Sequence, residues 1–233
     1  MSYSQWRLKM LRIVLSCAAI SGVLMLASCH NDNSDQKTAQ ISGKVSSKPI
    51  VSVVPIVDTT QNDVPWNLSD ELTALVQYRL SQKNKLFLID LPKVRAQAKK
   101  IKDNYNPFGP DLSWAKSVFP NDEYVVFMEL IEHEELYLND RKKPVNTKDC
   151  AAELNLGMRI RVIDLRGENP KVVLQELVRD SQFLPKQFTS TNFYQIPWGK
   201  ENFTTTPLGL AHVEFTKDIA SRIEDYILLA DKN

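Results

Sequence analysis

The chain has 233 residues, 29 of them basic and 28 acidic, and its formal net charge is +1. This balance does not suggest a surface that binds nucleic acid or anionic lipid through net charge, although a local basic patch stays open. With 43% hydrophobic residues, the chain has enough apolar content for one well-buried domain.

The N-terminal end has the order of a secretory signal peptide. Three basic residues precede an apolar run over residues 13–26. This run is short for a spanning helix and contains small polar residues throughout. It ends in a stretch that resembles a bacterial lipobox, Leu26, Ala27, Ser28 and Cys29. The resemblance implies cleavage before Cys29 and a lipid anchor on its thiol, the alternative being an uncleaved signal anchor.

Three parts are therefore expected: a lipoprotein signal peptide over 1–28, the lipidated cysteine and a flexible tether over 29–48, and a periplasmic domain over 49–233. The tether is polar and cannot bury enough surface to fold. Loss of the first 28 residues leaves 26 basic and 28 acidic residues, a formal net charge of −2. Cys150 then has no intramolecular partner, so it is either shielded or available for intermolecular pairing.

The first half of the domain predicts a strand, a helix and a strand. Residues 49–57 are apolar on both parities, as in a strand covered on both faces, and Pro55 marks an edge or bulge. A helix capped by Asn67 or Ser69 leads to a short strand over 86–89. Such a crossover makes its two strands parallel.

Two further helices are expected before the central strand. One runs from Pro92 to about Lys102, and its basic face is either solvated or meets phosphate or an acidic partner. The other is short, is capped by Asp111 and ends near Phe119.

The second half predicts a central strand and a long antiparallel hairpin. Residues 123–132 are apolar on both faces, and a polar excursion over 134–152 follows. Residues 153–165 alternate and pair with residues 171–183, whose apolar parity shifts between Leu174 and Val178 as in a bulge. A helix over 207–229 closes the chain. The residues expected in the core include Leu75, Val126, Met128, Leu156 and Ile160.

These elements predict an α/β (α+β) fold, a single mixed-sheet domain in the order βαβ(αα)βββα. Between the hairpin and the last helix lies an uncharged segment over 187–199 that is rich in aromatic rings. Phe193, Tyr194 and Trp198 are the candidate partner-binding residues of this segment. The alternatives are insertion into a membrane and coverage of the domain's own core.

No catalytic constellation is found. His133 lies among glutamates, but neighbouring strand residues point to opposite faces and a second histidine at helical spacing is missing, so a solvated strand end is expected. His212 is expected to be a packed or partly exposed residue of its helix. Without a phosphate-binding glycine loop, a nucleophile elbow or a paired-cysteine site, we expect no enzyme activity, no cofactor and no metal.

The order of elements resembles the periplasmic domain of the curli-secretion lipoprotein CsgG, the penicillin-binding-protein activator LpoB and the N-terminal domain of TolB. The local patterns that carry this resemblance run from Ile50 to Pro55, Lys85 to Asp90, Glu123 to Val126 and Arg161 to Leu165. They are patterns of fold, and they carry over no functional residue.

The lipobox, the tether and the resemblance together predict an outer-membrane lipoprotein, anchored through Cys29, whose domain binds an envelope protein or peptidoglycan. His30, rather than aspartate, follows the cysteine, which favours the outer membrane by the sorting rule of enteric bacteria. A tether of this length spans roughly 65 Å at most, so the partner is expected near that membrane. The alternative is a subunit of an oligomeric secretion channel similar to CsgG.

Overall fold

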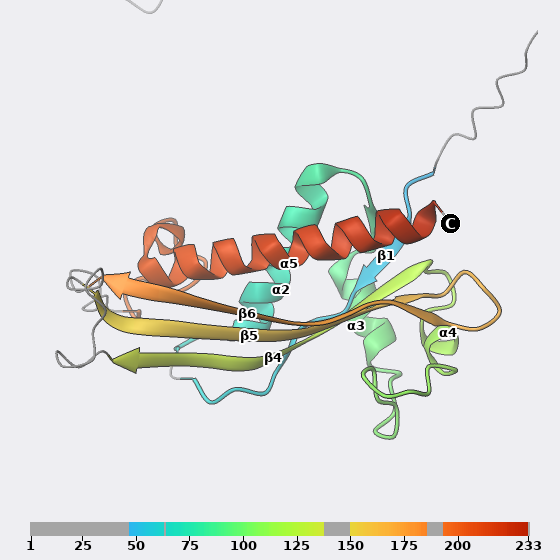
Figure 1. Ribbon diagram of the computed structural model, residues 1–233, viewed down its shortest axis with the longest axis horizontal. Helices are drawn as coiled ribbons and strands as arrows, with labels where there is room; N and C mark the ends of the chain where they lie inside the picture. The colour runs from blue at the N-terminus through green and yellow to red at the C-terminus, as the bar shows by residue number, and fades with distance from the viewer. Residues whose placement is uncertain (1–46, 63, 138–149, 186–192, 233) are drawn as a thin grey trace, which may run out of the picture. The chain divides into compact units, whose positions relative to one another are not determined.

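The computed structural model describes residues 47–62, 64–137, 150–185 and 193–232. Within these ranges the strands form a six-stranded mixed sheet in the order β3-β1-β4-β5-β6, with β2 also paired to β4 (Figure 1). The predicted α/β fold with a single mixed sheet is confirmed. The signal peptide, the lipobox with Cys29 and the tether as far as residue 46 lie outside the described residues.

The N-terminal strands are parallel to their neighbours. β1 (Ile50–Val53) lies between β3 (Phe87–Leu88) and β4 (Tyr124–Tyr137), as the predicted crossover requires. Pro55 interrupts the predicted strand, and β2 (Val57–Asp58) resumes pairing with β4. The backbone of Ile56, between the two, is satisfied by side chains: its N–H donates to Thr73 Oγ1 at 2.9 Å, and its carbonyl accepts from Ser69.

Two helices cover one face of the sheet. α2 (Leu68–Lys83) begins after Asn67, whose side chain accepts from the Asp70 N–H at 3.1 Å. α5 (Pro207–Asp231) begins after Thr206, whose hydroxyl accepts from the Gly209 N–H at 3.0 Å. Figure 1 shows α5 lying along β4, β5 and β6. The larger core lies between these helices and the sheet and includes Leu72, Val76, Met128, Leu156, Ile160, Phe215 and Ile223.

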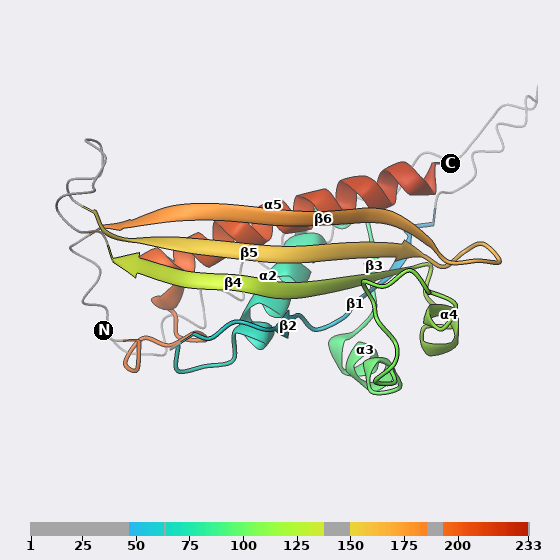
Figure 2. The same ribbon diagram turned by 60° about the horizontal axis from the view of Figure 1, so that its bottom comes forward.

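The opposite face is covered at one end only. α3 (Leu91–Ala98), α4 (Ala115–Val118) and the residues between them form a second core against β1 and the first part of β4. Figure 2 shows them at one end of the strands, with α2 and α5 behind the sheet. α3 is one turn shorter than predicted, because its C-terminal end at Ala98 is followed by turns rather than by helix as far as Lys102.

The predicted hairpin is confirmed, with two corrections. β5 (Cys150–Asp164) pairs antiparallel with both β4 and β6 (Lys171–Pro185). β4 and β5 extend into the stretch over 134–152 that was predicted as a polar excursion, because backbone pairing continues through residues with polar side chains. The bulge in β6 lies between Val172 and Leu174, rather than beyond Leu174 as predicted.

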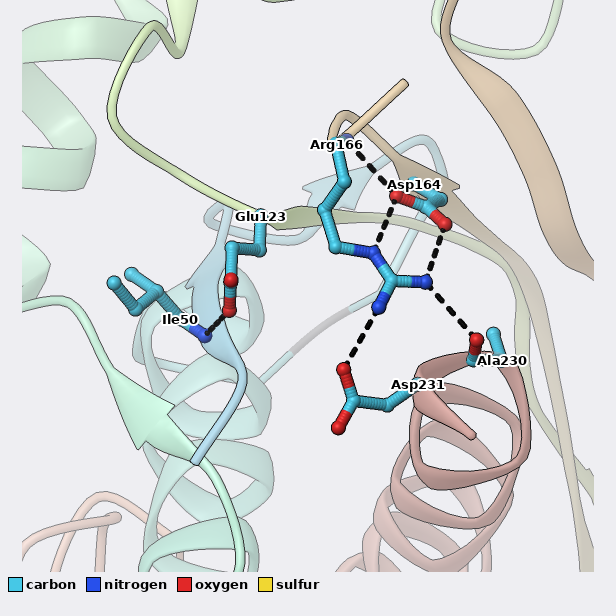
Figure 3. Close-up of polar contacts among 6 residues, drawn as sticks. All are labelled: Ile50, Glu123, Asp164, Arg166, Ala230 and Asp231. Atoms are coloured by element: carbon cyan, nitrogen blue, oxygen red, sulfur yellow. Dashed lines mark hydrogen bonds and ion pairs between the residues drawn. The ribbon is translucent and has the colours of Figure 1, made fainter. Parts of the chain in front are cut away.

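The end of the hairpin is joined to the C-terminus of α5 through Arg166. Its guanidinium binds the Asp164 carboxylate at 2.8 Å, donates to the Ala230 carbonyl at 2.9 Å and pairs with Asp231 at 2.8 Å (Figure 3). A cation is favourable at a helix C-terminus because the last carbonyls carry partial negative charge. Arg166 therefore fixes the end of α5 to the turn between β5 and β6.

The predicted core is largely confirmed. Val126, Met128, Leu156 and Ile160 are buried, whereas Leu75 is half-buried against the same core. In the part of the chain that the structure describes, no helix has the length and apolar content to cross a membrane.

Candidate functional site

A bulge in β4 decides which side chains reach each face of the sheet. Ile131 and Glu132 together stand opposite the single residue Gly157 on β5. A Cβ added to Gly157 would lie 2.9 Å from the Cβ of Glu132, so the glycine gives the bulge its room. The extra residue shifts the alternation of β4, and His133 consequently faces the core beneath α5.

Beyond the part that α3, α4 and the loop carrying Phe108 cover, no described helix packs on the face opposite α5. We call this surface the open face and define it by four exposed apolar side chains, Ile131 (36% exposed), Leu136 (42%), Leu177 (47%) and Phe183 (43%). Leu136 and Phe183 flank Glu153 in one row across the three strands, and Leu177 lies beside Arg159. These side chains are spread along the face between charged residues, and they can serve as an interaction surface where one partner covers several of them.

Two ion pairs lie on the open face, which also carries the carboxylates of Glu134 and Glu153. Arg159 binds Glu129 on the neighbouring strand, and its guanidinium lies 4.2 Å from the centre of the Phe108 ring. Arg179 binds Glu132 at 3.2 Å. A partner that docks here therefore does not have to supply counter-charges to the side chains of these two ion pairs.

Directly behind the open face, a chain of hydrogen bonds links β4, α5 and α2. The Nε2 atoms of His133 and His212 lie 3.0 Å apart. His212 Nδ1 lies 2.7 Å from Oε1 of Glu71, and Oε2 of Glu71 accepts from the Trp66 indole N–H at 2.6 Å. His212 and Glu71 are completely buried, and His133 is half-buried. The prediction of a solvated strand end at His133 is wrong, and the packed alternative for His212 is confirmed.

The contact between His212 and Glu71 determines the tautomers of the two imidazoles when the carboxylate is ionised. An ionised Glu71 carboxylate can only accept, so His212 carries its proton on Nδ1 and presents the lone pair of Nε2 to His133. His133 then donates from Nε2. The ring centroids are 5.2 Å apart, close to the separation of two imidazoles that meet head to head, as a hydrogen bond requires.

Two histidine nitrogens bound to one tetrahedral Zn²⁺ ion at about 2.0–2.1 Å lie about 3.3 Å apart. The two Nε2 atoms are closer together than that, at 3.0 Å, as a direct hydrogen bond requires. Among the residues that the structure describes, no group of three or more His, Cys, Asp or Glu side chains is arranged to hold a metal ion.

His133 resists protonation in this position. Burial, followed by the neighbouring His212 imidazole, lowers the pKa of His133 from 6.5 to about 4, although the Asp58 carboxylate on β2 acts in the opposite direction. Protonation of both imidazoles would also convert both Nε2 atoms into donors, so the hydrogen bond between them would be lost.

The aromatic residues predicted to bind a partner lie in two environments. Phe193 is half-buried and packs edge-on against Trp66, with ring centroids 6.0 Å apart. Tyr194 is 81% exposed, and Trp198 is half-buried. Trp66 also packs edge-on against the buried Phe203 at 5.1 Å. The segment is thus attached to the core through Phe193 and presents Tyr194 at the surface.

Cys150 is the first residue of β5, and residues 186–192 at the start of the aromatic segment lie outside the described residues. One basic side chain of α3, Arg95, forms an ion pair within the chain, with Asp70 on α2 at 2.5 Å.

Solved structures to which this chain is similar include the following three. The hypothetical protein CT253 from Chlamydia trachomatis is similar with 26% identity and a TM-score of 0.60, over 78% of this chain and 98% of that one. Lipoprotein GNA1162 from Neisseria meningitidis has 10% identity and a TM-score of 0.39, over 64% and 90% of the two chains. The LpoB C-terminal domain from Salmonella enterica has 12% identity and a TM-score of 0.35, over 60% and 87%.

No curated protein matches the sequence. A family model does match it, over residues 36–231, which include the whole of the described sheet and its helices. The chain therefore belongs to DUF7499, a family of unknown function.

Proposed function

We propose that this protein is a non-enzymatic lipoprotein of the outer membrane, anchored through Cys29, whose periplasmic domain binds another envelope protein through the open face. The anchor is supported by the lipobox at residues 26–29 and by the polar stretch that follows it. The binding role is supported by one observation above all, the apolar surface of Ile131, Leu136, Leu177 and Phe183 on a sheet face that the described helices leave uncovered.

The chemistry of the open face favours a protein partner over peptidoglycan. Saccharides and peptide stems present mainly hydroxyl, amide and carboxylate groups, whereas the open face offers apolar side chains beside two ion pairs. A protein partner can cover the apolar side chains and leave these ion pairs at the rim, which is the usual organisation of an interface. Tyr194 and Trp198 are proposed as a secondary contact, because the aromatic segment lies at the end of the sheet where α5 begins (Figure 1).

The binding role is tested with the double variant Leu177→Asp and Phe183→Asp, expressed in intact cells and captured after crosslinking. Both side chains are exposed, so the variant should melt within a few degrees of the wild type and lose the crosslinked partner. The matched control, Tyr194→Ala with Trp198→Ala, should keep most of the capture. Retained capture by the first variant would refute the open face as the binding surface, and cosedimentation of the purified protein with isolated peptidoglycan would refute the protein partner.

The anchor is tested separately with Cys29→Ala. This variant should accumulate as an unprocessed precursor with its leader attached, because the thiol that receives the lipid is missing. Normal maturation and membrane fractionation of Cys29→Ala would contradict the anchor without affecting the evidence for the open face.

A further inference from the structure

The chain of hydrogen bonds behind the open face joins two parts of the molecule that differ in how firmly they are held. His133 belongs to β4, a strand of 14 residues paired with β5 throughout its second half. His212 belongs to the second turn of α5 and lies behind the aromatic segment. Trp66 and Phe203 pack on each other, and the Phe203 ring also faces the His212 ring at 6.5 Å.

We propose that His133 and His212 form an acid-sensitive latch, which holds residues 193–206 (the described part of the aromatic segment and the turns after it) and the first turn of α5 on the sheet at neutral pH. The latch releases them when both imidazoles are protonated. The latch does not depend on the proposed function, since it concerns only contacts within the chain.

The release follows from the hydrogen-bonding capacity of the pair. The two imidazoles can take up one additional proton and keep their hydrogen bond, because either Nε2 atom can donate while the other accepts. A second proton leaves two N–H groups facing each other across 3.0 Å and places two positive charges in a buried site. The depressed pKa of His133 agrees with this reading.

The surroundings supply partial compensation for one positive charge and little for two. The Glu71 carboxylate on α2 contacts His212 Nδ1, and the negative charge of Asp58 on β2 favours protonation of His133. On β6, Asp180 lies two strands from His133 in the same row, but accepts from Gln182. The adjacent residues Glu132 and Glu134 fall on the opposite face of β4 because of the bulge, whereas Glu135, two residues along the strand, lies on the same face as His133 and is exposed to solvent.

Residues 193–206 are the part that gives way. They contain turns and a single 3-10 turn, η3 (Phe203–Thr205), whereas β4 is held by its backbone pairing with β5. Segments with few buried apolar contacts and irregular backbone open at lower free energy than paired strands do. Release of residues 193–206 exposes the half-buried Phe193 and Trp66 and the buried Phe203. This is less apolar surface than movement of β4 would expose, because that strand carries the buried Tyr124, Val126, Met128 and Leu130.

The test is hydrogen–deuterium exchange of the full-length protein at a series of pH values from 7 to 4.5, with each peptide compared between the wild type and His133→Gln. Glutamine can still donate a hydrogen bond and does not titrate, and comparison at equal pH cancels the intrinsic pH dependence of exchange. If opening takes up one proton, the opening constant of residues 193–206 in the wild type rises by about tenfold per pH unit relative to the variant.

Controls come from the chain itself. His30→Gln removes the one histidine outside the pair and should behave as the wild type. If His133→Gln fails to fold, the wild-type peptides over 193–206 are compared with those of α3 and α4, which should show no such excess. Equal pH dependence in all peptides would overturn the latch. Stabilisation by Zn²⁺ would also overturn the latch. If Zn²⁺ raised the melting temperature of the wild type but not that of His133→Gln, the two histidines would form a metal site.

Discussion

The two faces of the β4–β6 sheet are built from the same strands, but only one is covered along its whole length. The covered face presents Leu154, Leu156, Met158 and Ile160 in unbroken alternation beneath α2 and α5, all of them buried. The other face is apolar only near the start of β4, at Val125 and Phe127, where α4 and its flanking residues cover it. Farther along, it becomes a row of charged side chains interrupted by exposed apolar side chains.

This difference separates stability from binding. On the covered face, each apolar residue is removed from water when the chain folds, so its substitution changes the free energy of unfolding. On the open face, apolar residues remain in water in the folded domain, and their substitution changes stability little. Their burial contributes free energy only when a binding partner covers them, and it then contributes to the affinity of binding.

The strongest test of this comparison introduces the same charge on each face. Ile160→Asp places an unpaired carboxylate in the core and should destabilise the domain by more than about 4 kcal/mol, enough to prevent stable folding. Leu177→Asp, on the adjacent strand and the opposite face, should change the unfolding free energy by less than about 0.5 kcal/mol. Chemical denaturation of both variants measures the two effects, and similar values for the pair would show that the faces were assigned wrongly.

The pH dependence of stability should identify His133 as part of the covered face. Its folded-state pKa, about 4, lies below the ordinary value of 6.5, so the unfolded chain takes up the proton first. The contribution of His133 is therefore complete above about pH 6.5 and decreases as the pH falls toward 4. At about 1.4 kcal/mol per pH unit the total loss is about 3 kcal/mol.

Urea denaturation of the wild type and of His133→Gln between pH 7 and 4 checks this value. Carboxylates titrate in both proteins, so the difference between the two curves isolates the histidine. Parallel curves across the whole range would mean that His133 is solvated in the folded protein.

The first turn of α5 should be equally sensitive to a single methyl group. A Cβ on Gly209 would lie 2.1 Å from the carbonyl oxygen of Phe203, which is backbone and cannot rotate away. Gly209→Ala should therefore cost about 2–3 kcal/mol and loosen the aromatic segment. Gly167→Ala, in the turn between β5 and β6, is the matched control, since the added Cβ would have only ordinary contacts there. Equal melting temperatures of the two variants would contradict the close contact.

A smaller loss of unfolding free energy is expected from a substitution at the C-terminal end of α5. Arg166→Ala removes the contacts to Asp231 and to the Ala230 carbonyl, but these are partly exposed and screened by solvent. We expect a loss of about 1 kcal/mol, measured as a reduced midpoint of denaturation, and a further reduction of the effect at high salt. An effect as large as that of Gly209→Ala would show that the ion pairs, and not the packing of its first turn, hold the helix in place.

The sequence predicted the covered face better than the open one, for reasons visible in particular residues. Alternation from Leu154 to Val162, the cap at Asn67 and the helical spacing of apolar residues after Pro207 are local signals, and they identified the hairpin and both long helices. The bulge at Ile131 and Glu132 has no comparable local signal, because it depends on Gly157, a residue on a different strand. Without the bulge, His133 is assigned to the wrong face and its pairing with His212 is missed.

Arg161 illustrates a second limit of sequence patterns. Strand alternation predicted it outward, and it does point away from α5, yet it is buried because it donates to the Pro107 and Gly109 carbonyls at 3.0 and 2.5 Å. The loop that covers it has no regular pattern from which its position follows. Long-range contacts of this kind depend on the tertiary fold, and so do the limits of the open face.

Site-specific photo-crosslinking in intact cells tests the binding role of the open face most directly. A photoreactive residue in place of Leu177 on the open face is compared with one in place of Tyr78 on α2, because both positions are similarly exposed in the domain. We expect a discrete crosslinked product of one envelope protein from position 177, lost when Phe183→Asp is added, and no such product from position 78. The same product from both positions, or from position 78 alone, would contradict the assignment of the open face as the binding surface.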